Sequence, residues 1–280
     1  MTYSKISPGP SAAAAFVLAL AGCTGANGES AKSPEESSGA SAPGIEIEYI
    51  AHASFLMRAE DGTELLIDPY ASRVWLGYDW PDGIAPNAIL ITHPHYDHDA
   101  GRYREMPFPW SDEVPIVDAP GETAFGAFTV TGVRGKHADP YGMEFGQLNT
   151  LMIVEAHGLR IAHLGDNGPL TAEMIQGLGR VDVLMMPGDA VDHIISPETT
   201  EAILTELDPS VVIPMHYRLP DLEVSEDSPS DLGDIEPWLE GRARVRRLSN
   251  NSTKLSISAL PAEREYLVFA HAPYVVGPTG

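Results

Sequence analysis

A dense cluster of metal-ligand side chains follows an apolar run in the stretch Ile89-Leu90-Ile91-Thr92-His93-Pro94-His95-Tyr96-Asp97-His98. The apolar run predicts a buried strand. Strand ends are where α/β folds bind ligands, because rigid strands fix the loops that follow them. Imidazole and carboxylate are ligands for zinc and neighbouring divalent ions. Packing around a strand does not call for three imidazoles and a carboxylate within six residues, so the stretch predicts a metal site.

Four more segments repeat this arrangement of an apolar strand followed by a ligand-type residue. Taken alone, an aspartate before a proline is usually a turn former, and a single histidine after a strand is more often a capping or surface residue. Their repetition alongside the dense cluster makes them candidate site residues. They are Asp68 after 65–67, His137 after 128–133, Asp166 after 161–164 and His216 after 211–215.

From Ile45 onward the chain alternates predicted strands, turns and helices. Alternating or wholly apolar runs predict strands, and apolar residues at helical spacing predict three helices. Two groups of strands with intervening helices favour one layered α/β domain over 45–280. Besides the runs named above, we expect strands at 45–49, 54–58, 148–155, 181–186, 244–248, 254–258 and 266–269, and helices at 170–178, 197–207 and 232–239.

The ordered set of motifs resembles the metallo-β-lactamase-fold superfamily of metal-dependent hydrolases. Its HxHxDH motif is present as His93, His95, Asp97 and His98, and the other positions follow in order. The resemblance implies a four-layer αβ/βα sandwich. Segments 51–56, 66–69, 163–166 and 214–217 look most like the branch that contains ascorbate phosphate lactonase and the phospholipase D acting on N-acyl phosphatidylethanolamines.

The resemblance also implies two divalent metal ions. One would be held by His93, His95 and His137, the other by Asp97, His98 and His216, and Asp166 would bridge them. A divalent ion lowers the pKa of bound water from about 15.7 to roughly 7. A hydroxide held between the ions would then attack an ester, lactone, amide or phosphoester. Zinc is the expected metal, with manganese or iron as alternatives.

Asp97, Asp68 and His52 form the candidate catalytic set. Asp97 is a metal ligand, a general base after the attack, or both at different steps. Asp68 is expected to orient a ligand histidine. His52 either lines the pocket and donates to substrate or makes a turn hydrogen bond, and both interpretations stay open.

The remaining histidines and charge clusters receive simpler interpretations. His163 lies within a predicted strand, which favours a buried supporting histidine over a ligand. His193 is taken as a loop histidine, although substrate contact is an alternative, and His157 and His271 receive no role. The acidic segment 221–236 is interpreted as a solvated loop or a lid. The arginines between 242 and 247 are interpreted as an exposed strand face that balances nearby acids, with an anionic-substrate patch as the alternative.

Composition bounds the class of protein. The 280 residues are 43% hydrophobic, enough to bury one sizeable core. Lys and Arg number 17 against 40 Asp and Glu, and the formal net charge of −23 disfavours nucleic acid as a partner. The single cysteine, Cys23, excludes both an intrachain disulfide and a CxxC zinc site.

The N-terminal segment 1–22 predicts a signal peptide. Its apolar run ends in Leu20-Ala21-Gly22-Cys23, which resembles the lipobox of bacterial lipoproteins and implies cleavage before Cys23 and lipidation on it. Residues 23–44 are rich in Ser, Gly, Ala and Pro and predict a flexible tether. The expected location is the periplasmic side of the cell envelope, with membrane contact through the lipid alone. Thr24 favours the outer membrane, and an ordinary secretion signal is the alternative.

Together these features predict a lipid-anchored metal-dependent hydrolase that cleaves an ester, lactone or phosphodiester of a small molecule or lipid. One alternative is an iron-dependent redox enzyme of the same fold, and the other is a metal-binding lipoprotein without turnover. The complete ligand set argues against mononuclear iron, and the intact Asp97 and Asp166 argue against a retired site.

Overall fold

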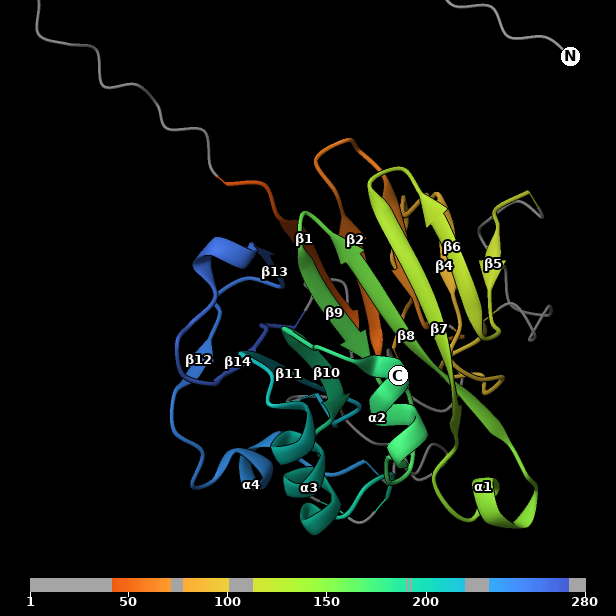
Figure 1. The fold of residues 1–280 in the computed structure, drawn as a ribbon, viewed down its shortest axis with the longest axis vertical. Coiled ribbons are helices and arrows are strands. Elements are labelled where there is room, and N and C mark those ends of the chain that lie inside the picture. Colours follow the sequence, from red (N-terminus) through yellow and green to blue (C-terminus); the bar gives the residue numbers. More distant parts are fainter. Residues whose placement is uncertain are drawn as a thin grey trace, which may run out of the picture. The chain divides into compact units, whose positions relative to one another are not determined.

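The computed structural model describes residues 42–71, 78–100, 113–189, 191, 193–219 and 232–271. In this part of the chain, two β-sheets lie face to face (Figure 1). In spatial order, the six-stranded sheet contains β13 (Ser252–Leu255), β1 (Ile45–Ala51), β2 (Ser54–Arg58), β3 (Glu64–Ile67), β4 (Ala88–Leu90) and β5 (Ile116–Val117). The eight-stranded sheet contains β12 (Val245–Arg247), β14 (Glu265–Val268), β11 (Val211–Met215), β10 (Val183–Pro187), β9 (Leu159–His163), β8 (Leu148–Ala156), β7 (Phe128–Lys136) and β6 (Gly121–Phe125).

The strands that precede the predicted site residues run in matching directions. Strands β3 and β4 pair in parallel, as do β9, β10 and β11. Strand β8 is antiparallel to both β7 and β9, so β7 runs in the same direction as β9. The carboxyl ends of β7, β9 and β11 therefore meet at one edge of their sheet, and those of β3 and β4 meet at one edge of theirs.

The core lies between the sheets. Phe55 and Leu66 from the six-stranded sheet, and Ile153 and Met185 from the eight-stranded sheet, are fully buried. Burying one such side chain stabilises the fold by about 1.5–3 kcal/mol relative to exposing it. This packing holds the two sheet edges in register with each other.

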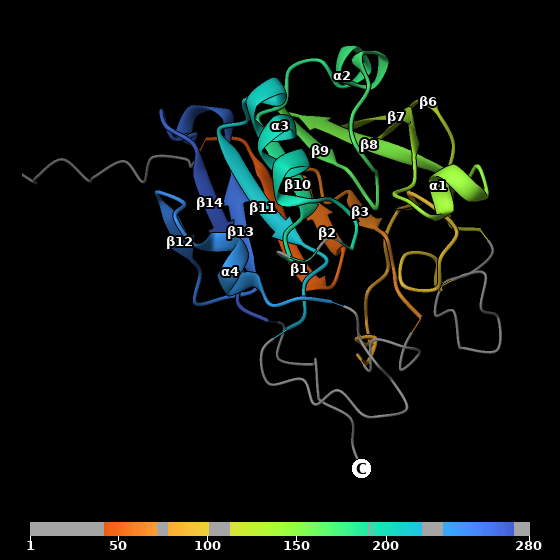
Figure 2. The same cartoon turned by 90° about the horizontal axis from the view of Figure 1, so that it is seen from below.

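Helices α2 (Ala172–Leu178) and α3 (Pro197–Leu207) lie on the outer side of the eight-stranded sheet (Figure 2). The Ser196 hydroxyl accepts from the Thr199 backbone N–H at 3.1 Å and so caps α3, while Ile203 and Leu204 form part of its buried face. Shorter helical segments are α1 (Tyr141–Glu144), α4 (Ile235–Leu239) and the 3-10 helix η2 (Ile257–Ala259). None of the helices in the described part of the chain is long and apolar enough to cross a membrane.

The predicted α/β class is confirmed, and the facing mixed sheets form the inner layers of the expected αβ/βα sandwich. Helix α3 has the predicted bounds, whereas α2 begins at Ala172, two residues later than predicted, after its cap Thr171. The strand predicted at 254–258 is wrong in its second half, because Ile257–Ala259 turns into a 3-10 helix. The predicted signal peptide, Cys23 and all but the last residues of the predicted tether lie outside the described residues.

Candidate metal centre

The seven predicted ligands and His52 come together where the strand ends of the two sheets face each other. They form two groups, and within each group the candidate ligand atoms lie within 4.8 Å of one another. The first group is His93, His95, His137 and Asp166, and the second is His52, Asp97, His98 and His216. The HxHxDH residues follow β4, whereas His137, Asp166 and His216 follow β7, β9 and β11. The centre is therefore built by both sheets.

The Asp166 carboxylate lies between the two groups. Its Oδ2 is 3.7 Å from the Nε2 atoms of both His93 and His137. Its Oδ1 is 3.2 Å from His98 Nε2, and its Oδ2 is 3.2 Å from His216 Nε2. The Asp166 carboxylate therefore lies close to histidines of both groups.

Three of the histidines use one ring nitrogen to fix the direction of the other. His98 Nδ1 lies 2.8 Å from Asp68 Oδ2, His137 Nδ1 donates to the Ala138 carbonyl at 2.9 Å, and His95 Nε2 donates to Gln147 Oε1 at 3.1 Å. Such outer contacts select the tautomer whose remaining nitrogen presents a lone pair to a metal. In each case the remaining nitrogen faces the centre.

His93 follows the same pattern through its neighbour Thr92. The Thr92 hydroxyl donates to Asp68 Oδ2 at 2.7 Å, so it can accept from His93 Nδ1 at 3.0 Å. His93 Nε2 and His95 Nδ1 are then directed inward and lie 3.1 Å apart. Two lone pairs at this separation repel unless a proton or a cation lies between them.

This donor set fits a pair of divalent cations. Imidazole nitrogens and carboxylate oxygens are the ligands that zinc and its neighbours in the first transition row accept. The Nε2 atom of His137 is buried and makes no hydrogen bond to any group in the described part of the chain. A metal bond to this atom would satisfy it, since a buried polar atom without a partner is costly.

The electrostatics of the centre also fit bound cations. Burial disfavours the ionised form of Asp166, but His216 and His98 outweigh it and hold the pKa of this carboxyl well below its usual value. Burial opposes the charged form of His98, yet Asp166, Asp97 and Asp68 together raise its pKa well above its usual value. By contrast, burial lowers the pKa of His93 well below its usual value. The buried carboxylates thus require positive charge beside them, which cations in the two groups would supply.

Asp68 makes the contact that its predicted orienting role requires. The side chain is fully buried, and its carboxylate accepts from the Thr92 backbone N–H at 2.8 Å, from the Thr92 hydroxyl and from His98.

His163 is also fully buried, with its Nδ1 3.9 Å from Asp68 Oδ2. It accepts at Nδ1 from the Gly165 N–H at 3.1 Å and donates from Nε2 to the Ala53 carbonyl at 2.9 Å. His163 is therefore a supporting histidine in the core, as predicted.

The structure places His52 inside the centre. Its side chain is fully buried, its Nε2 lies 3.1 Å from Asp97 Oδ2, and its ring centroid is 4.0 Å from that of His216. Burial and the neighbouring His216 bring the pKa of His52 down to about 3, so its ring is neutral and donates to Asp97. The His52 side chain therefore lines the centre. The backbone carbonyl of His52 makes a separate hydrogen bond, which it accepts from the His216 N–H at 3.0 Å.

A third group of ligand-type side chains borders the centre and contains Asp189, His193 and His216. The Asp189 carboxylate is buried, with His193 Nδ1 3.9 Å from its Oδ2. Burial raises the pKa of Asp189 above its usual value. His193, interpreted from the sequence as a loop residue, thus lies beside a predicted ligand, with its ring centroid 5.5 Å from that of His216.

Backbone strain is concentrated at the centre. Six non-glycine residues of the described chain have positive φ, and His52, Asp68 and His216 are three of them. Such conformations cost roughly 1–3 kcal/mol each and persist where the surroundings fix them. Gly165, immediately before Asp166, has φ +53, and a Cβ there would lie 2.6 Å from Asn149 Oδ1 and Thr92 Oγ1. Glycine at this position lets the backbone approach closely enough to place Asp166.

Sequence reasoning missed three side chains that support the ligands. Thr92 borders the motif and could have been suspected from its position alone. Gln147 and Tyr141 follow His137 by ten and four residues without any local pattern. Yet Gln147 bonds His95, and the Tyr141 ring lies 5.0 Å from that of His95 and 5.3 Å from that of His137.

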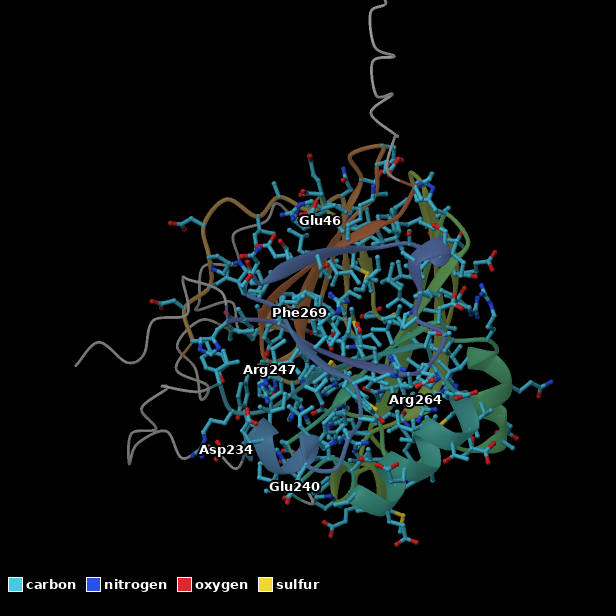
Figure 3. All side chains as sticks on the ribbon, turned by 90° about the vertical axis from the view of Figure 1, so that its left-hand side faces the viewer. Glu46, Asp234, Glu240, Arg247, Arg264 and Phe269 are labelled. Carbon is cyan, nitrogen blue, oxygen red and sulfur yellow. The ribbon has the colours of Figure 1, made fainter. Side chains whose placement is uncertain are left out.

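The arginine cluster lies on and just before β12, and Figure 3 labels one of its members, Arg247. Each arginine pairs with an acid: Arg242 with Glu201, Arg244 with Glu263, Arg246 with Glu265 and Arg247 with Glu236. Arg246 and Arg247, exposed on β12, agree with the expected strand face balanced by acids, whereas the Arg242 side chain is only 11% exposed, precedes the strand and packs over the Trp238 ring. Most of the acidic segment 221–236 lies outside the described residues, and Asp234, within the described part, pairs with Arg218.

Comparison with known proteins locates this arrangement in a family. Residues 46–216 match the family described as "Beta-lactamase superfamily domain". A UPF0173 metal-dependent hydrolase of Methanosarcina barkeri is 30% identical over 196 residues, covering 62% of this chain and 84% of the relative. One from Salinibacter ruber is 27% identical over 214 residues, covering 68% and 92%.

Solved structures show the same fold. A metallo-β-lactamase superfamily protein from Thermotoga maritima superimposes with a TM-score of 0.59 at 22% identity, over 80% of this chain and 98% of that one. The metallo-β-lactamase fold protein YhfI of Bacillus subtilis gives a TM-score of 0.50 at 13% identity, over 84% and 99%. The ordered motifs, the two facing sheets and these matches lead to one conclusion: the chain belongs to the metallo-β-lactamase superfamily.

Proposed function

We propose that this chain is a dinuclear metal-dependent hydrolase that cleaves an ester, lactone or phosphodiester bond in a small molecule or lipid. The observation that carries the proposal is the position of Asp166, whose carboxylate contacts histidines of both ligand groups. Relatives in the same family are named metal-dependent hydrolases, which supports the reaction class. Within the superfamily, we infer that the chain belongs to the branch that contains ascorbate phosphate lactonase and the N-acyl phosphatidylethanolamine phospholipase D.

Two divalent ions, zinc above all, would be held by the two groups and would supply water of lowered pKa and polarisation of the substrate oxygen. The protein's part is to fix the ligands. Asp68 holds His98, Gln147 holds His95, and the Ala138 carbonyl holds His137. Burial of this network keeps bulk water away from the ligand nitrogens.

Asp97 and His52 are the groups placed to take part in proton transfer. Asp97 is 7% exposed and contacts neutral His52 at 3.1 Å, and burial opposes its ionisation while His98 and His52 lower its pKa below the usual value. Asp97 is therefore ionised, as a metal ligand or a proton acceptor must be. His52 keeps the carboxylate in position by donating its single N–H.

The test combines metal analysis with a substrate screen on protein loaded with zinc or manganese. We expect two ions per chain, and metal-dependent hydrolysis of p-nitrophenyl acetate, γ-butyrolactone or bis(p-nitrophenyl) phosphate. His95→Ala and Asp166→Asn should each reduce the rate by at least about 100-fold, since several kcal/mol of transition-state stabilisation depend on the metals. His271→Ala, an exposed histidine outside the centre, is the matched control.

Two results would contradict the proposal. A wild-type protein as inert as His95→Ala on every substrate would indicate a binding protein without turnover. Tightly bound iron in place of zinc or manganese, together with no hydrolysis, would favour the redox alternative.

We also propose that the chain is anchored through a lipid on Cys23, at the periplasmic side of the outer membrane. The support is the Leu20-Ala21-Gly22-Cys23 sequence after an apolar run, followed by a composition typical of a tether. In a bacterial host, wild-type protein should partition into the detergent phase of Triton X-114, and Cys23→Ser should remain in the aqueous phase. Equal partitioning of the two proteins would contradict the anchor.

A further inference from the structure

An apolar surface lies beside the candidate metal centre. The described part of the chain exposes seven large apolar side chains, and four of them fall within the eight residues 141–148. We call these residues the α1 segment. Scattered exposed apolar side chains need no explanation, but a concentrated group marks a binding surface. The four are Tyr141, Met143, Phe145 and Leu148, exposed by 45%, 70%, 69% and 50%.

This surface is continuous with the centre. The Tyr141 ring lies edge-on to His95 and His137, with centroids 5.0 and 5.3 Å apart. The Phe145 ring lies 5.9 Å from that of Tyr141, farther along the same segment. In Figure 1, α1 lies at the end of the β7–β8 pair from which His137 comes. A molecule held at the first ligand group would therefore meet Tyr141 first and could extend over Phe145.

Charge and size decide among possible occupants. The α1 segment contains no lysine or arginine, and its one charged residue, Glu144, is exposed. With a formal net charge of −23, the protein would be repelled by an anionic bilayer. A fully buried aromatic side chain contributes about 150–250 Å², so four partly exposed side chains fall short of the roughly 800 Å² per partner in a stable dimer. The surface fits a small apolar group held at the adjacent centre.

We propose that the α1 segment binds an alkyl or aryl group of the substrate, so that the substrate is an ester, lactone or phosphodiester carrying an apolar chain. This inference rests on the proposed hydrolase function and specifies its substrate class. The metal ligands would hold the polar head of the substrate, and Tyr141 and Phe145 would lie against its chain. Burial of each methylene on this surface then favours longer chains.

The test measures binding of an alkylphosphonate series to zinc-loaded protein by calorimetry, because the phosphonate head suits a dinuclear centre whichever bond is cleaved. Affinity should rise by roughly threefold per methylene that reaches the α1 segment. We expect octylphosphonate to bind at least about 30-fold more tightly than methylphosphonate. The double variant Met143→Ser/Phe145→Ser should keep methylphosphonate affinity within about twofold and lose at least tenfold of the octyl preference.

A matched control removes two exposed apolar side chains elsewhere. Ile116→Ser/Ile257→Ser changes residues that are 50% and 40% exposed on β5 and η2, and it should keep the full octyl preference. Equal melting temperatures of the two double variants would show that both are folded. An octyl preference that is absent from the wild type, or unchanged in Met143→Ser/Phe145→Ser, overturns the inference.

The other occupants give distinct results. Loss of phosphatidylcholine-vesicle binding in the α1 variant, with the octyl preference unchanged, would assign the surface to a bilayer. A wild-type dimer and a monomeric variant in light scattering, again with unchanged preference, would assign it to a second copy. Failure of the proposed hydrolase function is recognised separately: a zinc-loaded wild type that keeps the octyl preference but hydrolyses none of the model substrates would retain the apolar binding surface and contradict turnover.

Discussion

Asp68 Oδ2 lies 2.8 Å from His98 Nδ1, and both side chains are fully buried. The contact joins the end of β3 to the HxHxDH motif after β4. Because the same carboxylate also accepts from the backbone and the hydroxyl of Thr92, it fixes the first ligand residues of the motif as well as the last.

The first prediction concerns this carboxylate. Asp68→Asn keeps the shape of the side chain but replaces one acceptor with a donor, so at least one of its three contacts becomes unfavourable. We expect metal affinity in the group containing His98 to fall by about 10–100-fold. Competition against a chromophoric chelator measures it. Glu122→Gln, an exposed carboxylate on β6, should change nothing, and an Asp68→Asn protein with wild-type metal affinity would refute the orienting role.

The second prediction concerns metal removal. Cations that bind only the folded state stabilise it by about 2.7 kcal/mol at 100 times the dissociation constant. For a domain of this size, that corresponds to a fall in Tm of about 5–10 °C on chelation. Scanning calorimetry of zinc-loaded and chelator-treated protein measures the shift. His93→Ala/His137→Ala should show a much smaller response, and a wild-type Tm indifferent to chelation would count against a metal centre.

The third prediction concerns Gly165. Alanine there would combine a left-handed backbone with close contacts to Asn149 and Thr92. Gly62→Ala is the matched control, because Gly62 has φ +85 but a Cβ added there would meet nothing within 4 Å. The strain alone costs roughly 1–2 kcal/mol. Urea unfolding should therefore give about that loss for Gly62→Ala and at least twice as much for Gly165→Ala; equal losses would mean that the close approach to Thr92 is unimportant.

The fourth prediction concerns alkaline pH. Burial raises the pKa of Tyr78 to about 12 and also raises that of Tyr217. The folded state thus retains protons that the unfolded state releases near pH 10. The stability linked to these hydroxyls is fully present below about pH 10 and is lost as pH rises through the folded-state pKa values.

Absorbance at 295 nm and circular dichroism followed together would check this. Deprotonation of Tyr78, which is fully buried, should accompany unfolding. Tyr78→Phe should extend the stable range to higher pH relative to the wild type. Complete ionisation of all tyrosines before any change in circular dichroism would contradict the prediction.

Much of the fold was predictable because its strands are short apolar runs with clear ends. Strand β11 and helix α3 have the predicted bounds, since Val211–Met215 is wholly apolar and Ser196-Pro197 marks a helix start. Strand β6 was missed because Gly121–Phe125 is mostly exposed and carries no apolar alternation. Helix α1 was missed because it is a single turn.

The centre was predictable where ligands follow strands directly, and unpredictable where support comes from distant loops. His93, Asp166 and His216 each stand at a strand end, so topology alone brings them together. The contact of Gln147 with His95 spans 52 residues, and that of His52 with Asp97 spans 45. Such pairings depend on how the two sheets are stacked, which local patterns do not encode.

The origin of the ligands in both sheets has a mechanical consequence. An ion shared by His93 and His137 would tie the end of β4 to the end of β7, across the interface between the sheets. It would act as a cross-link closing a long chain loop, and the entropy of the opened state would fall accordingly. Separation of the sheets would then require dissociation of the ions. Hydrogen exchange of the facing strands should therefore slow on metal loading, even at amides far from the centre.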